Sequence, residues 1–244
     1  MGEVESLLQK YEDKPLLKAL VQSVTIPVKI SQDNTSYQIE IPVGLVFDAA
    51  MSTLYQNLRA KRLGILFEEL EKGETILSID LIKSEEFFHR FLITTNAALK
   101  TYQDEKIRRF ARLLIASTSS NSFSGMDDYE ELLSILDELS DREFWILATL
   151  ERYEMQFSLQ PDENEFQQAK RFWQKFIYQI KNDLCIPQDE VDSSLIRLPR
   201  SGCYQLFAGN WGGNTQNIGR LTSRYYRLSK LVKERGDFLR HHKQ

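Results

Sequence analysis

Apolar residues recur along the first half of the chain at spacings of three and four residues, the period of an amphipathic helix. Residues 3–22 show this pattern, and Pro15 inside it predicts either a kink or two short helices. A longer helical pattern covers 45–72, where the apolar positions shift register near Leu63. These patterns predict a mainly helical N-terminal part.

Between these two helical patterns, apolar and polar residues alternate. Residues 24–30 and 37–43 follow the alternation, and the turn-forming segment 31–36 separates them. Alternation of this kind is typical of half-buried strands, so we expect a small β-hairpin near 24–43. Each expected strand contains a proline, which suits only the edge of a sheet because proline has no N–H to donate.

Helix starts and a polar break divide the rest of the chain. Ser84 can cap one helix, and Asp104 begins another. The segment 117–126 is rich in serine and has no periodicity, which is typical of a linker. We therefore predict a helical domain over 1–120 and a second domain over 127–244.

The second domain contains helix and strand patterns in a definite order. Its first helix opens with Ser140-Asp141-Arg142-Glu143, a capping box in which serine and glutamate each satisfy a free backbone N–H. The predicted elements after that helix are a helix over 162–184, a helix from Pro187, strands over 203–207 and 218–222 around the loop 209–217, and a last helix over 223–235.

Leu195, Leu198 and Gly202 close the helix that starts at Pro187, and the two strands follow directly. This order resembles a winged helix-turn-helix domain, over about residues 140–236. The resemblance implies a winged-helix-like C-terminal domain, in which the helix from Pro187 is the recognition helix and the two strands form the wing. The fold class we expect is thus mainly α, with a hairpin-bearing N-terminal part and a winged helix after it.

Two features depart from a DNA-binding winged helix. The segment between its first two helices is longer than usual. The expected recognition helix also begins with Asp189, Glu190 and Asp192, which would repel phosphates. The fold inference therefore carries more weight than the DNA inference. The helical run over 84–139 resembles uncharacterised bacterial proteins, which implies no activity.

Charge is distributed unevenly, although the whole chain carries only −4. Residues 191–244 hold ten Lys and Arg against three Asp and Glu, whereas 121–190 hold six against sixteen. Either the basic end contacts an anionic partner such as duplex DNA, or the two segments pack against each other. The residues expected to contact DNA are Arg197, Arg200, Arg220, Arg224, Arg227 and Lys230, with Trp211 at the tip of the wing.

Motifs of common enzymes do not occur. The metalloprotease, P-loop, dinucleotide-binding and nucleophile-elbow patterns are all missing, so we predict no catalytic residue, cofactor or metal site. Cys185 and Cys203 lie beside apolar residues and are expected to be buried thiols. No apolar segment reaches the roughly 18 residues of a membrane span. Without a secretion signal at the start, a cytoplasmic location is expected.

Together these features favour a non-enzymatic protein-interaction or assembly module built on a winged helix, with a regulatory role as one option. The alternative is a winged-helix DNA-binding protein that contacts phosphates through its basic C-terminal segment. The register shift near Leu63 leaves apolar residues on more than one side of the long helix. One side can serve the core and another a second copy, so we expect a homodimer.

Overall fold

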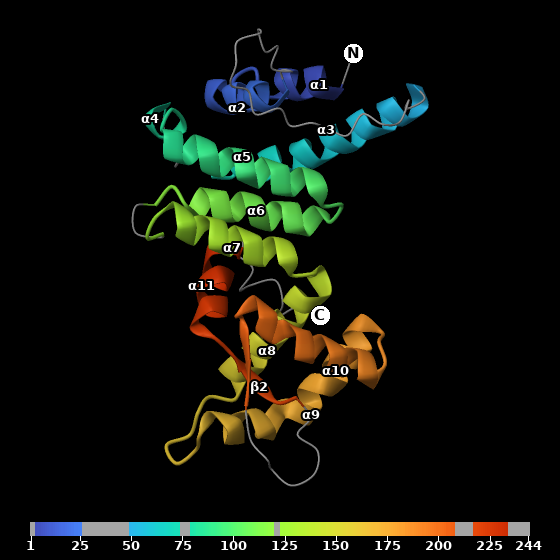
Figure 1. Cartoon of the computed structure of the whole chain (residues 1–244), viewed down its shortest axis with the longest axis vertical. Coiled ribbons are helices and arrows are strands. Elements are labelled where there is room, and N and C mark those ends of the chain that lie inside the picture. The colour runs from blue at the N-terminus through green and yellow to red at the C-terminus, as the bar shows by residue number, and fades with distance from the viewer. Residues whose placement is uncertain (1–2, 26–48, 74–78, 120–122, 208–216, 234–244) are drawn as a thin grey trace, which may run out of the picture. The chain divides into compact units, whose positions relative to one another are not determined.

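The computed structural model describes residues 3–25, 49–73, 79–119, 123–207 and 217–233 (Figure 1). Helices account for 76% of these residues, and the strands among them form one antiparallel pair. The prediction of a mainly helical chain is therefore confirmed.

The chain divides into two compact units, Met1–Glu130 and Glu131–Gln244. The boundary falls inside helix α7 (Met126–Glu138), a few residues beyond the expected linker at 117–126. Each unit has its own buried apolar residues.

The first unit is built from six helices in its described residues, and the start of α7 completes it. They are α1 (Glu3–Lys10), α2 (Pro15–Thr25), α3 (Ala49–Glu71), α4 (Ile79–Ile82), α5 (Glu85–Lys100) and α6 (Asp104–Ala116).

Pro15 is the first residue of α2, a position where a missing N–H costs no hydrogen bond, so two short helices replace one kinked helix. Because α2 continues through Thr25, the prediction that a strand begins at Val24 is wrong. The helical spacing of Leu17, Leu20 and Val24 prevails there over the local alternation. The rest of the expected hairpin, over 26–43, lies outside the described residues.

Helix α3 packs against α1 and α2 and also against α5 and α6, which Figure 1 shows as layers on its two sides. Phe67 illustrates this position, because its ring lies 6.1 Å from that of Tyr11 and 6.2 Å from that of Phe91 on α5. The register shift near Leu63 thus matches two layers of the same chain. This packing buries Leu63, Leu66 and Leu70, whereas Leu58 is 42% exposed, so the homodimer stays a prediction.

A buried ion pair joins α3 to α6. The Arg112 Nε lies 2.7 Å from a Glu69 carboxylate oxygen, and the two side chains are only 11% and 3% exposed. Lys72 contacts the same carboxylate at 2.7 Å. Burial by itself raises the pKa of Glu69, but the hydrogen bonds and charges of Lys72 and Arg112 outweigh burial and lower it.

Arg90 of α5 holds both sides of the serine-rich segment. Its buried guanidinium donates hydrogen bonds to the carbonyl oxygens of Ser117 at 3.0 Å and Gly125 at 3.5 Å. It also lies over the rings of Phe123 and Tyr129, 5.6 and 5.3 Å from their centres. Gly125 has a φ of 147°, which glycine adopts readily and other residues rarely do. The described ends of this segment are therefore anchored to α5.

The second unit follows the order expected from the sequence. After the end of α7 come α8 (Asp141–Gln156), α9 (Glu165–Leu184), α10 (Gln188–Arg197), a 3₁₀ helix (Leu198–Ser201), β1 (Tyr204–Leu206), β2 (Gly219–Leu221) and α11 (Ser223–Val232). The capping box at the start of α8 is confirmed, with hydrogen bonds in both directions between Ser140 and Glu143.

The hairpin pairs Gln205 with Arg220 and Leu206 with Gly219, so both predicted strands are confirmed. A Cβ atom at Gly219 would collide with the ring of Tyr204, and only glycine fits beside it. The Tyr204 hydroxyl in turn donates to the carbonyl of Asn217 at 2.7 Å. The tip of the expected wing, 208–216, lies outside the described residues.

The buried pair in the first unit gives a stability prediction. Replacing Arg112 with Met should lower the free energy of unfolding by about 3 kcal/mol, because the buried Glu69 carboxylate loses a donor. Since the pKa of Glu69 is lowered in the fold, this stability is present above the ordinary carboxyl pKa of 4.5 and is lost as the pH falls. The loss from the substitution should thus be largest near neutral pH and shrink in acid, as urea titrations can measure.

Lys61→Met is the matched control, because Lys61 pairs with Asp104 at 3.2 Å with both side chains about half exposed. It should cost less than about 1 kcal/mol. Equal losses in the two variants would contradict the role given to the buried pair.

Candidate functional site

Helix α8 carries three carboxylates toward one side. Glu143, Glu151 and Glu154 are separated by eight and three residues, which places them within one sector of an α-helix. All three contact residues that come later in the chain, between the 3₁₀ helix and the end of α11. We call these three residues the α8 carboxylate row.

Glu143 has two tasks at the start of α8. It completes the capping box with Ser140, and its carboxylate contacts two of the arginines expected to bind DNA. The Arg200 Nη2 lies 3.2 Å from its Oε1, and the Arg197 Nη2 lies 3.9 Å from the same atom. Because the Glu143 side chain is 2% exposed, these two guanidinium groups are the counter-charges of a buried anion.

Glu151 is the buried centre of the row. One of its oxygens accepts hydrogen bonds from the hydroxyl groups of Tyr225 at 2.9 Å and Ser229 at 3.3 Å. The Lys233 ammonium lies 2.7 Å from both carboxylate oxygens. The three donors are spaced four residues apart along α11 and its end, so they share one helix face. Glu151 thereby holds α11 against α8.

Glu154 binds the entry to α11. It accepts the backbone N–H of Leu221 at 3.0 Å and the hydroxyl of Tyr226. Burial and the negative charge of nearby Glu151 raise the pKa of Glu154, and they outweigh the opposing effects of its two donors and of Arg220. The charged form of this carboxyl is therefore disfavoured in the folded protein.

The structure places the other expected DNA-contacting residues as follows. Arg220 pairs with Glu165 and donates to the Gln205 side chain at 3.1 Å. Arg224 lies 2.7 Å from Glu131. Arg227 and Lys230 are exposed on α11, and Trp211 lies outside the described residues. Arg197, Arg200, Arg220 and Arg224 thus contact carboxylates of the acidic segment 121–190.

Cys203 is buried as predicted, but Cys185 is exposed, so the prediction of a buried thiol is wrong there. Cys185 ends α9 with a left-handed φ of 52°, which turns it out of the apolar face of the helix. Within the described ranges, no three His, Cys, Asp or Glu side chains gather closely enough to hold a metal ion. No helix in the described part of the chain is long and apolar enough to cross a membrane.

Sequence patterns did not indicate the α8 carboxylate row. Glu151 and Glu154 look like ordinary surface glutamates, and the spacing of Tyr225, Ser229 and Lys233 was the available signal, because it puts three donors on one face. The sequence patterns also did not indicate the lysines on the outer side of α9, Lys170, Lys175 and Lys181. No protein-family model matches this chain, and no match exists among the curated proteins or solved structures compared with it.

Glu154 gives a pH-dependent prediction. Glu154→Gln keeps an oxygen for the Leu221 N–H and a polar group for Tyr226, but it does not titrate. Because the folded pKa of Glu154 is raised, wild-type protein loses stability relative to this variant as the pH rises through that pKa. The thermal midpoint of the variant, relative to wild type, should therefore increase from about pH 4 to about pH 8.

The control for this series is Glu138→Gln, which removes an exposed carboxylate from α7. This substitution removes one negative charge at an exposed position, so it measures the effect of the lost charge without any effect of burial. A relative midpoint of Glu154→Gln that falls with rising pH would contradict the assignment.

Proposed function

We propose that this protein is a non-enzymatic interaction or assembly module whose C-terminal unit is a winged helix. The proposal rests on the order α8, α9, α10, hairpin and α11 together with the outward face of α10. In a DNA-binding helix-turn-helix, the helix that corresponds to α10 is the one that contacts the bases. The chemistry of its exposed side chains therefore indicates the kind of partner.

The single observation that carries the proposal is that this face is apolar and acidic. Ile196, near the C-terminal end of α10, is 59% exposed. Asp189 and Asp192 lie seven and four residues earlier on the same side. Carboxylates repel a phosphate backbone, whereas an exposed isoleucine gains free energy by burial against another apolar surface. A protein surface fits this face better than a nucleic acid does.

The positions of the arginines support the same conclusion. A DNA-binding surface needs cations that are free to displace counterions from phosphates. Arg200 and Arg224 are instead engaged by Glu143 and Glu131 of the same chain. Breaking such a contact to bind a phosphate would remove a counter-charge from a carboxylate, and for buried Glu143 this loss is costly.

The second candidate function is DNA binding through the exposed side of α11. Arg227 and Lys230, three residues apart there, are the observation in its favour. Two cations can make only two phosphate contacts, whereas many DNA-binding proteins make about six to ten. We therefore rank DNA binding second.

The test combines stability with DNA affinity. The triple variant Arg200→Ala, Arg220→Ala, Arg224→Ala should lose roughly 1–3 kcal/mol of unfolding free energy, because three ion pairs within the unit disappear. Wild-type protein should show no measurable affinity for duplex DNA at about 50 mM salt in fluorescence anisotropy.

Lys230→Ala is the control, since it removes an exposed cation from α11. It should leave the unfolding free energy within about 0.5 kcal/mol of wild type. Duplex DNA binding that weakens in the triple variant and becomes less salt-dependent would overturn the proposal in favour of DNA binding through the basic C-terminal segment, and binding that weakens in Lys230→Ala would favour the exposed side of α11.

A further inference from the structure

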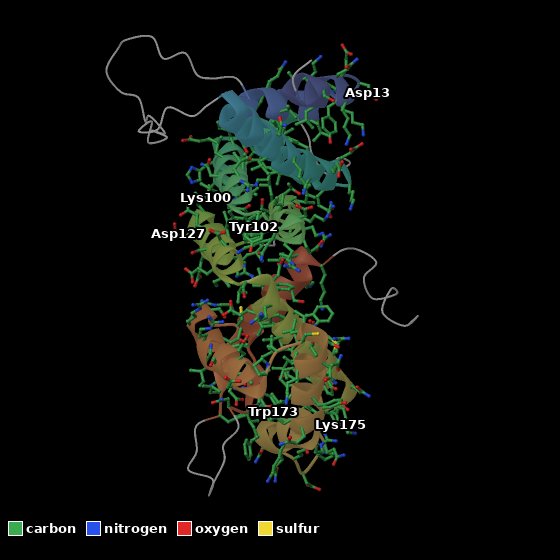
Figure 2. The ribbon with its side chains drawn as sticks, turned by 90° about the vertical axis from the view of Figure 1, so that its right-hand side faces the viewer. Asp13, Lys100, Tyr102, Asp127, Trp173 and Lys175 are labelled. Carbon is green, nitrogen blue, oxygen red and sulfur yellow. The ribbon has the colours of Figure 1, made fainter. Side chains whose placement is uncertain are left out.

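Helix α9 carries a row of cationic and neutral polar side chains on its outer side. Lys170, Gln174, Tyr178 and Lys181 follow one another at spacings of four, four and three residues, which places them on one face. The apolar residues of α9 lie on the other side, where Phe172, Trp173 and Phe176 are buried. Figure 2 labels Trp173 and Lys175, which lie on opposite sides of this helix.

This face is cationic within an acidic segment. Residues 121–190 contain six Lys and Arg, and four of them stand on α9. The two carboxylates of α9, Glu165 and Asp183, lie away from the row, and each has a partner: Arg220 contacts the first, and Gln179 donates to the second at 3.2 Å. The outer row thus presents positive charge that its own helix does not neutralise.

The lysines of this face differ from the arginines near α8. Among the residues that the structure describes, Lys170, Lys175 and Lys181 form no ion pair. Lys175 has its ammonium 5.9 Å from the centre of the Phe157 ring. Three cations are therefore available to a partner at the surface of a unit whose other described cations mostly contact carboxylates.

Tyr178 stands in the middle of the row and is 69% exposed. Within the described part of the chain, its side chain has no hydrogen-bond or ring partner. Tyrosine is enriched at the centres of protein interfaces because it buries a large area with few rotatable bonds. An exposed tyrosine between lysines is the arrangement of an apolar centre with a charged rim.

We propose that this outer face of α9 docks an acidic amphipathic helix of a partner protein. The proposal rests on the interaction function proposed above and names the surface and the partner chemistry. The partner's apolar stripe covers Tyr178, and its carboxylates on either side of the stripe meet Lys170, Lys175 and Lys181. From Lys170 to Lys181 the row spans about 16 Å, or three turns of a partner helix lying along α9.

A nucleic acid fits this row less well. Duplex DNA carries one charge per roughly 1.7 Å, so it would extend past three lysines. Just beyond Lys181 the chain presents Asp183, Asp189 and Glu190, all exposed. A partner helix can place its carboxylates only beside the lysines, whereas a phosphate backbone brings charge to the acidic residues as well.

The test uses a synthetic helical peptide of about 20 residues with a leucine stripe flanked by glutamates. Fluorescence anisotropy measures its affinity for the full chain. The triple variant Lys170→Glu, Lys175→Glu, Lys181→Glu should weaken binding at least about tenfold, because attraction becomes repulsion. Tyr178→Ala should also weaken it, and Tyr178→Phe should restore most of the affinity.

The matched control is Lys83→Glu, Lys100→Glu, Lys230→Glu, which changes the net charge equally at exposed lysines elsewhere. It should change peptide affinity less than about threefold. Circular dichroism confirms that both triple variants remain helical, and the exposed Tyr178 variants supply a readout that does not depend on charge reversal.

Three outcomes would overturn the inference: no binding of the acidic peptide by wild type, equal loss in both triple variants, or DNA binding that the α9 variant alone abolishes. The first two leave the proposed interaction function standing. That function falls separately, if duplex DNA binds through Arg200, Arg220 and Arg224.

Discussion

A buried carboxylate needs hydrogen-bond donors within the fold. In the C-terminal unit, the buried carboxylate of Glu151 imposes this requirement on the last helix. Without Tyr225, Ser229 and Lys233 its charge would cost several kcal/mol. With them, a single side chain of α8 contacts two successive turns of the last helix and the residue after its end. Because these donors are fixed on one face of α11, the register of that helix against α8 is fixed as well.

The same requirement determines where the other charges of the unit go. Glu143 forms an ion pair with Arg200 of the 3₁₀ helix, and Glu154 accepts a hydrogen bond from the Leu221 N–H at the end of the hairpin. Much of the positive charge of 191–244 is thus used to hold the chain to its acidic segment. Within the described ranges, the outer side of α9 also remains cationic, although this helix belongs to the acidic segment itself. Net charge along the sequence therefore locates the charged surface poorly.

The sequence was most informative wherever a local signal determined the structure. The cap at Ser140, the two strands around Gly219 and the start of α5 after Ser84 all depend on residues close in the chain. The pairing of Arg224 with Glu131 or of Arg200 with Glu143 joins residues many positions apart, and any of several carboxylates satisfies the pattern. Long-range packing likewise decides which apolar residues of α3 are buried, and Leu63, Leu66 and Leu70 are among them.

The anchoring of the serine-rich segment has a consequence for dissecting this protein. Composition suggests cutting the chain between 117 and 126 to obtain two fragments. Arg90 binds carbonyls on both sides of that stretch, and Tyr129 beyond it hydrogen-bonds Thr94 of α5 at 2.5 Å. A cut there separates the Arg90 guanidinium from the Gly125 carbonyl and the Tyr129 ring, and the Thr94 hydroxyl from that of Tyr129. A cut after Glu130 keeps these contacts together and instead divides α7. Of these two fragment boundaries, one therefore breaks side-chain contacts and the other divides a helix.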